Sequence, residues 1–120
     1  MRAELTREFT FEAAHRLTGV GPTHKCASLH GHTYRVEITV AGEVDPATGM
    51  VLDFARLSAA WQPLAAELSG RLLNELPGLA NPTSELLAAW LWQRLKPELP
   101  ELAEVAIRET ATAVCRYRGA

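Results

Sequence analysis

The chain has 120 residues, of which 48% are hydrophobic and 22% charged, and its formal net charge is −2. This length and composition predict one globular domain over residues 1–120 and exclude a disordered chain. No run of Lys or Arg suits nucleic acid or an anionic membrane, and no stretch reaches the roughly 18 apolar residues of a membrane span, so we expect neither partner and a cytoplasmic protein.

The first predicted element is a strand. Residues 3–15 alternate between apolar and polar side chains, which is the period of a half-buried strand. The parity of Phe9 and Phe11 continues to His15. Two glycines and a proline then indicate a loop that ends at Cys26.

A second strand follows this loop. Tyr34 and Val36 begin an apolar set that alternates with polar residues up to position 40. His30 and His32 share the parity of that apolar set. The turn-forming sequence GEVDPATG comes next.

Two helices and a closing pair of strands are predicted after this turn. From Asp53 the apolar residues recur at helical spacing, although Pro63 is expected to kink or divide this helix. A second amphipathic helix follows, with Asn81 as its expected N-cap and Pro82 in its first turn, and its apolar positions are Leu86, Leu87, Trp90, Leu91 and Leu95. The segment AEVAIRETATAVCRYR alternates again and predicts one or two strands.

This order, ββααββ, predicts an α+β fold, in which a four-stranded antiparallel sheet carries two helices on one face. Four strands leave two open edges, so pairing between subunits is expected.

Three histidines form a candidate metal site. Residues i and i+2 of a strand project to the same face about 7 Å apart, so His30 and His32 can converge on one ion. If the two strands pair, His15 supplies a third imidazole. Three neutral nitrogens leave one position of a tetrahedral zinc ion open, as in catalytic sites. The alternative is that these are ordinary core or surface histidines.

Cys26 and Glu109 are the other candidate site residues. The Cys26 thiol can act either as a zinc ligand or as a base or nucleophile beside the cation. A chain with only two cysteines is expected to have free thiols, although the sequence also permits one disulfide between Cys26 and Cys115. Glu109 shares the parity of apolar Val105 and Ile107, so its carboxylate needs a partner. That partner is a flat, guanidine-like ligand edge, a nearby Arg or solvent.

These residues belong to longer stretches that resemble the 6-pyruvoyl-tetrahydropterin synthase family, and most closely its bacterial 6-carboxy-5,6,7,8-tetrahydropterin synthase branch, which serves the queuosine pathway. The matching stretches span nearly the whole chain in order: FTFEAAHRL, HKCASLHGHTYRVEI, GMVLDFARL, LLNELPGLANPTSELLAAWLW and ETATAVCRYRG.

The resemblance implies the tunnelling fold, with sheets of several subunits joined into a barrel, commonly in a hexamer built as a dimer of trimers. It implies Zn²⁺ on three histidines, a catalytic Cys26 that abstracts a substrate proton, and a Glu109 that anchors the pterin ring. It also implies that the segment Thr83, Ser84 and Glu85 helps to bind pterin across the interface. The three zinc ligands it implies are His15, His30 and His32.

The implied reaction converts 7,8-dihydroneopterin triphosphate to 6-carboxy-tetrahydropterin, with triphosphate elimination and release of acetaldehyde. The chain departs from the family at one place. The usual pattern L-D-H-x-x-L-N reads LSGRLLN here, so Ser69 and Gly70 replace an Asp-His acid/base pair. Neither residue relays a proton at pH 7.

Three readings follow from this departure. The first is an active synthase, in which His24 or a zinc-bound water takes over the missing role. The second is an altered lyase that acts on another pterin, such as dihydroneopterin or sepiapterin. The third is a zinc-containing pterin-binding protein without turnover.

Overall fold

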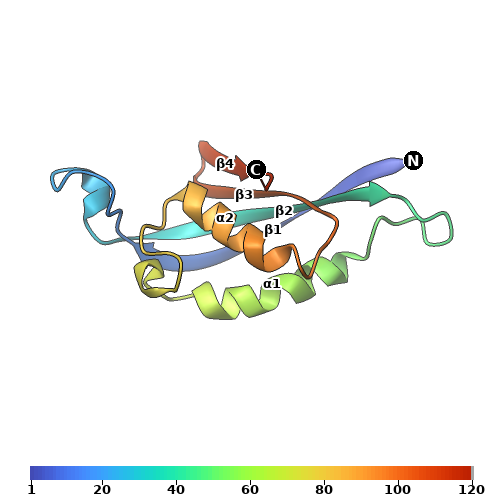
Figure 1. Ribbon diagram of the computed structural model, residues 1–120, viewed down its shortest axis with the longest axis horizontal. Coiled ribbons are helices and arrows are strands. Elements are labelled where there is room, and N and C mark those ends of the chain that lie inside the picture. Colours follow the sequence, from blue (N-terminus) through green and yellow to red (C-terminus); the bar gives the residue numbers. More distant parts are fainter. Residues whose placement is uncertain (120) are drawn as a thin grey trace.

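A computed structural model describes residues 1–119, which form four strands, two α-helices and two short 3-10 helices. The strands are β1 (Arg2–His15), β2 (His30–Glu43), β3 (Leu102–Thr110) and β4 (Ala113–Tyr117). The α-helices are α1 (Phe54–Leu68) and α2 (Ser84–Leu95), and the 3-10 helices are η1 (Lys25–Ala27) and η2 (Leu73–Glu75). The predicted order ββααββ is confirmed (Figure 1).

The strands form one antiparallel sheet in the order β1-β2-β3-β4. β1 and β2 pair along their whole length, from Arg2 opposite Glu43 to His15 opposite His30. The loop of residues 16–29 therefore joins two directly paired histidines at one end of an elongated molecule of 57 × 24 × 24 Å (Figure 1). β1 and β4 are the outer strands of the sheet.

Both helices cover the same face of the sheet, and the hydrophobic core lies between these two layers (Figure 1). Phe11 stacks on Tyr34 with ring centroids 4.9 Å apart, and Trp61 of α1 packs against Phe11. α2 adds Leu87 and Leu91, whose side chains are fully buried. Removal of this apolar surface from water is the main stabilising contribution to the fold.

The start of α2 differs from the sequence prediction. The N-cap of α2 is Thr83, whose side chain accepts from the Leu86 N–H, and the prediction of Asn81 was wrong. The Asn81 side chain instead accepts a hydrogen bond from the Thr18 N–H, so it is not free to cap.

Pro63 lies inside α1, and the helix continues through it without a boundary. The carbonyl that loses its helical partner there belongs to Ala59, four residues earlier and exposed. Water can satisfy that carbonyl, which explains why the helix need not end.

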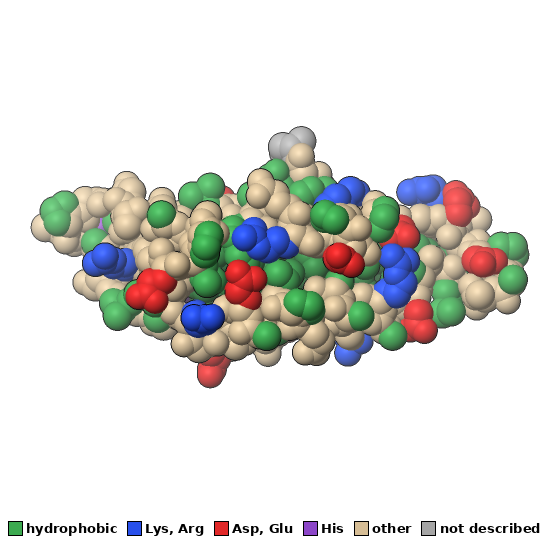
Figure 2. All heavy atoms as spheres, turned by 60° about the horizontal axis from the view of Figure 1, so that its bottom comes forward, with side chains coloured by type: hydrophobic (Ala, Val, Ile, Leu, Met, Phe, Trp, Pro, Cys, Tyr) green, Lys and Arg blue, Asp and Glu red, His purple; other side chains and the backbone are tan. Residues whose placement is uncertain are grey.

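The face shown in Figure 2 carries acidic and basic side chains interspersed with small apolar patches, and charge of one sign does not gather there. No helix among residues 1–119 is long and apolar enough to cross a membrane.

Candidate metal centre and pocket

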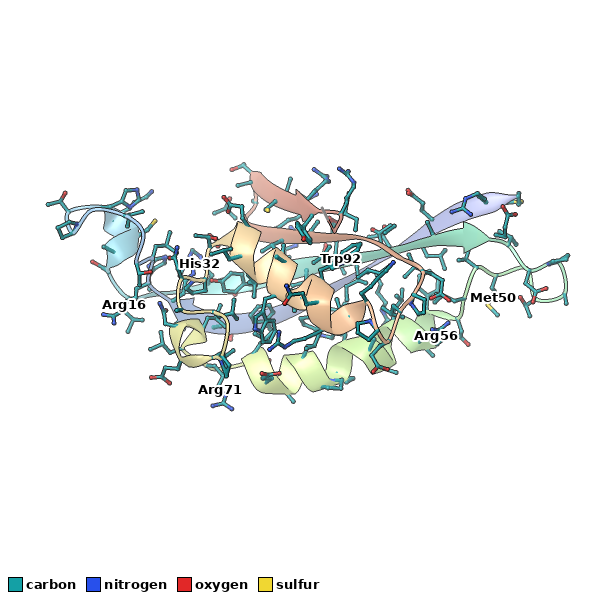
Figure 3. All side chains as sticks on the ribbon, in the orientation of Figure 1. Arg16, His32, Met50, Arg56, Arg71 and Trp92 are labelled. Atoms are coloured by element: carbon teal, nitrogen blue, oxygen red, sulfur yellow. The ribbon has the colours of Figure 1, made fainter. Side chains whose placement is uncertain are left out.

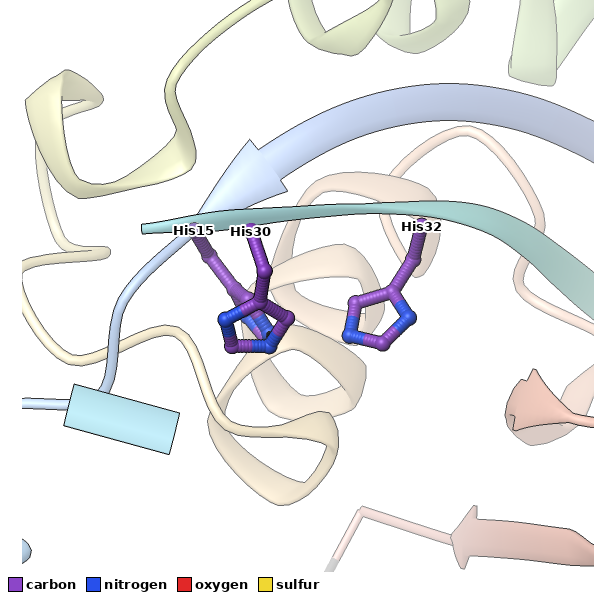
Figure 4. A group of neighbouring side chains, drawn as sticks. All are labelled: His15, His30 and His32. Atoms are coloured by element: carbon purple, nitrogen blue, oxygen red, sulfur yellow. Dashed lines mark hydrogen bonds between the residues drawn. The ribbon is translucent and has the colours of Figure 1, made fainter. Parts of the chain in front are cut away.

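The side chains of His15, His30 and His32 converge at the end of the sheet (Figure 4). One ligand nitrogen from each lies within 4.8 Å of the others. Strand pairing produces this cluster, because His15 lies opposite His30 and Ala13 opposite His32. His15 is 1% exposed, whereas the side chain of His32 is 22% exposed. The cluster therefore has a buried inner ligand and a side that is open to solvent.

Hydrogen bonds to backbone carbonyls orient two of the three rings. His15 Nδ1 lies 2.9 Å from the Pro82 carbonyl oxygen, and His30 Nδ1 lies 2.7 Å from the Ser28 carbonyl oxygen. Because a carbonyl oxygen only accepts, each neutral ring carries its proton on Nδ1 and leaves Nε2 as a lone pair.

The two Nε2 atoms of His15 and His30 face each other at 3.0 Å. Two lone pairs at that distance repel unless a cation or a shared proton lies between them. Metal-binding histidines usually donate the hydrogen of their other ring nitrogen to a carbonyl or carboxylate oxygen in this way. The donor set therefore fits a zinc ion, which prefers neutral imidazole nitrogens.

The environment of His15 keeps its imidazole neutral. Burial lowers the pKa of His15 below its ordinary value of 6.5, and this effect outweighs the raising effects of the Pro82 carbonyl and of Glu109. The buried Tyr34 hydroxyl lies 3.0 Å from His15 Nδ1, and burial raises the pKa of Tyr34 so that it stays a neutral phenol.

The three histidines line a pocket of about 340 Å³ together with Cys26 and Glu109, which we call the metal pocket. This volume lies within the usual range for small-molecule sites. The Cys26 thiol is partly exposed and free, and Cys115 is also free, so the open question of a bridge between them is resolved. Lys25 lines the same pocket next to Cys26.

Glu109 lies near the end of β3, the strand next to β2, and lines the same pocket as Cys26. Its Oε1 accepts a 2.7 Å hydrogen bond from the Ser84 hydroxyl, and its Oε2 is 3.9 Å from His32 Nε2. No Arg side chain pairs with it in residues 1–119. One of its oxygens is thus left available to a ligand.

The segment Thr83, Ser84 and Glu85 lies next to this carboxylate. Thr83 caps α2, while Ser84 and Glu85 line a second pocket of about 430 Å³ with Glu109 and Cys115. Burial, with the carboxylates of Glu85 and Glu109, raises the pKa of Cys115. Cys115 therefore remains a protonated thiol at neutral pH, and Glu109 borders both pockets.

Ser69 and Gly70 lie outside the metal pocket of their own chain. Ser69 follows the last residue of α1, and Gly70 has φ +71°. Gly70 lines a separate pocket of about 510 Å³ that shares only His32 with the metal pocket. His24 is also absent from the residues that line the metal pocket, and its Nδ1 accepts from the Cys26 N–H at 3.0 Å.

Sequence reasoning missed three contributors to this site: the Pro82 carbonyl, the Tyr34 hydroxyl and the side chain of Asn74. Tyr34 shares the parity of His32, which is a signal that it faces the same way. An asparagine in a single-turn 3-10 helix and a backbone carbonyl give no periodic signal.

The family profile of 6-pyruvoyl tetrahydropterin synthase matches residues 4–120. The chain is 42% identical over 119 residues to the 6-carboxy-5,6,7,8-tetrahydropterin synthase of Synechocystis sp., with 92% of this chain and 89% of that protein covered. It is 34% identical over 137 residues to human 6-pyruvoyl tetrahydrobiopterin synthase, with coverage of 98% and 92%.

A third relative has a different named activity. The dihydroneopterin monophosphate aldolase of Pyrococcus furiosus is 34% identical over 100 residues, with 83% of this chain and 81% of that protein covered. Among solved structures, the 6-pyruvoyl tetrahydropterin synthase of Caenorhabditis elegans superposes with a TM-score of 0.92 at 29% identity, covering 100% of this chain and 97% of that one.

Proposed function

We propose that this chain, which belongs to the 6-pyruvoyl tetrahydropterin synthase family, is a zinc-dependent lyase of the 6-carboxy-5,6,7,8-tetrahydropterin synthase type. Its substrate is 7,8-dihydroneopterin triphosphate, and its products are 6-carboxy-tetrahydropterin, acetaldehyde and triphosphate, in the biosynthesis of queuosine and related 7-deazapurines. The observation that carries the proposal is one pocket that contains three converging imidazoles, a free thiol and a carboxylate.

In this proposal His15, His30 and His32 hold the zinc ion through ring nitrogens that face one another. A bound zinc ion supplies a Lewis acid, which makes C–H bonds beside substrate oxygens more acidic. Cys26 is the base that takes the proton from the substrate side chain. Cys26 lines the same pocket as the three histidines, so its thiol is near the place where the substrate side chain would lie.

Glu109 orients the substrate. A carboxylate accepts two parallel N–H bonds from a flat amino-pyrimidine edge, which matches the guanidine-like part of a pterin. Ser84 donates to one oxygen of Glu109 and so fixes the rotation of the carboxylate. The pterin ring is then held at a set distance from the base and from the metal-binding histidines.

Two observations favour a second candidate function. Ser69 and Gly70 supply no acid/base pair, and a relative at 34% identity is named as an aldolase. The alternative is therefore an altered homologue that acts on another pterin or only binds pterin. This alternative keeps the same zinc ligands and the same Glu109 anchor.

Product analysis by mass spectrometry separates the two candidates. Zinc-loaded protein is incubated with 7,8-dihydroneopterin triphosphate and, separately, with dihydroneopterin and sepiapterin, and Cys26→Ala serves as the matched control. The proposal predicts 6-carboxy-tetrahydropterin and acetaldehyde from the wild type and not from Cys26→Ala. Bound but unchanged triphosphate substrate would contradict it.

The double variant Ser69→Asp/Gly70→His then tests the departure from the family. Gly70 has φ +71°, a conformation that strains any residue with a side chain, but the space around it is open and His is among the residues enriched in that region. If the missing pair limits turnover, the double variant is faster than the wild type. Equal rates would mean that other groups carry the second proton transfer.

A further inference from the structure

The amide of Asn74, which lies in η2, holds the first residue of the loop between two metal-binding histidines. Asn74 Oδ1 accepts from the Arg16 N–H at 2.9 Å, and Asn74 Nδ2 donates to the Arg16 carbonyl at 2.8 Å. Nδ2 also donates to the Ala80 carbonyl at 3.1 Å. One acceptor and both amide hydrogens are used, so the side chain has one orientation.

The hydrogen bonds continue from Arg16 to the thiol residue. The Leu17 N–H, next in the chain, donates to the Cys26 carbonyl at 2.8 Å, and the Cys26 N–H donates to His24 Nδ1. Both backbone groups of Cys26 are therefore fixed, one through the segment that Asn74 holds. Figure 3 shows Arg16 at the same end of the molecule as His32, with Met50 and Arg56 at the other end.

Asn74 also connects this loop to the segment whose Pro82 carbonyl orients His15. Through Ala80 it holds the segment that continues to Pro82, whose carbonyl orients His15 Nδ1. His15 itself immediately precedes Arg16. One side chain thus braces the loop of Cys26 and the inner histidine from the same point.

We propose that Asn74 is a positioning residue that fixes the Cys26 thiol relative to the three-histidine centre. The thiol's role as base rests on the proposed function, whereas the positioning rests on the hydrogen bonds alone. A loop of 14 residues between two strands has many conformations when unrestrained, and a base must be placed to within about 1 Å of its working position. The three bonds of Asn74 select one of these conformations.

The test uses zinc-loaded full-length protein in a Cys115→Ser background, where Cys26 is the remaining thiol. Asn74→Ala is compared with the parent for the rate of Cys26 alkylation by iodoacetamide and for amide hydrogen exchange at Leu17. We expect both to rise about tenfold, because loss of these bonds lets the loop open locally. Exchange in the centres of β2 and α2 and the zinc stoichiometry stay unchanged, and kcat falls about tenfold with KM unchanged.

Matched variants calibrate the effect. Asn81→Ala removes the single bond to the Thr18 N–H in the same loop and is expected to have a smaller effect. Asn74→Asp keeps the acceptor for the Arg16 N–H but sets a carboxylate oxygen against the Arg16 and Ala80 carbonyl oxygens, so it is expected to raise both readouts at least as much as Asn74→Ala. Gln93→Ala removes an exposed amide on α2 and changes neither readout.

Two results would overturn the inference: unchanged alkylation and exchange in Asn74→Ala, or a uniform rise of exchange through β2 and α2, which would show a role in global stability only. Failure of the proposed function is distinguishable, since a wild type without product would leave the alkylation and exchange comparison intact.

Discussion

His15 is the residue on which the constraints of the candidate metal centre converge. It is buried, its Nδ1 is engaged by the Pro82 carbonyl and its Nε2 faces His30. A buried imidazole with a lowered pKa stays neutral and keeps its Nε2 lone pair near neutral pH. His15 is therefore prepared as a ligand by the fold itself, whereas the more exposed His32 completes the set.

Removal of one ligand tests the assignment of the three histidines. His32→Ala is expected to weaken zinc binding by more than about 100-fold, since even partners that only support ligands are worth about 10–100-fold. Competition with a chromophoric chelator measures the affinity. His24→Ala is the matched control, because His24 lies in the adjoining loop and outside the metal pocket. Equal losses in the two variants would contradict the assignment.

The buried His15 predicts a pH dependence of stability in the metal-free protein. Its folded pKa is lowered, so the unfolded chain takes up the proton first as the pH falls. The free energy of unfolding is then unaffected above about pH 7 and decreases as the pH falls from about 6.5 through the lowered pKa.

Urea unfolding between pH 8 and pH 5 measures this slope. In His15→Gln, which cannot titrate, the slope over that range is expected to be shallower. Identical slopes in the two proteins would show that His15 is not the group responsible.

At the scale of elements, the start of α2 combines a structural and a binding role. Thr83 caps the helix, and the next residue, Ser84, bonds Glu109. A helix that begins at a fixed residue places the Ser84 hydroxyl at a fixed point beside the carboxylate. The cap thus contributes to the pocket without contacting a ligand itself.

Thr83→Ala is expected to lower the free energy of unfolding by about 1 kcal/mol, the usual value of an N-cap. For a chain of this length the melting temperature falls by about 4 °C. Thermal denaturation at matched protein concentration measures it. Thr83→Ser retains the hydroxyl and is expected to melt close to the wild type; a Ser variant as unstable as Ala would contradict capping.

The strands were more predictable than the site. Alternation over residues 3–15 and 30–40 depends on burial of one sheet face, and β1 and β2 follow it closely. His15 could be predicted to join His30 only on the condition that the two strands pair. The structure supplies the register, in which His15 lies opposite His30. The hydrogen bonds made by the Asn74 side chain and by the Pro82 carbonyl could not be predicted, because these residues lie in segments whose sequence has no regular alternation of apolar and polar residues. The cap of α2 was misplaced by two residues because Asn81 and Thr83 are both good caps.

At the scale of the whole molecule, the sheet is covered by helices on one face and has outer strands β1 and β4. Open edges of this kind pair readily with other strands. We therefore propose a homo-oligomeric barrel, with a hexamer arranged as a dimer of trimers.

Light scattering coupled to size-exclusion chromatography measures the mass of the assembly. The expected result is six chains of 13.1 kDa each, stable on dilution to micromolar concentration. A single 13.1 kDa species under those conditions would contradict assembly through the strand edges.

In the proposed reaction, three imidazoles hold a catalytic zinc ion and the Cys26 thiol stays free to act as the base. X-ray absorption at the zinc edge distinguishes a free thiol from a zinc-bound one. We expect one zinc per chain with nitrogen and oxygen neighbours at about 2.0–2.1 Å and no sulfur neighbour. A sulfur shell at about 2.3 Å that disappears in Cys26→Ala would make the thiol a ligand rather than a base, and the proposed role of Cys26 would be wrong.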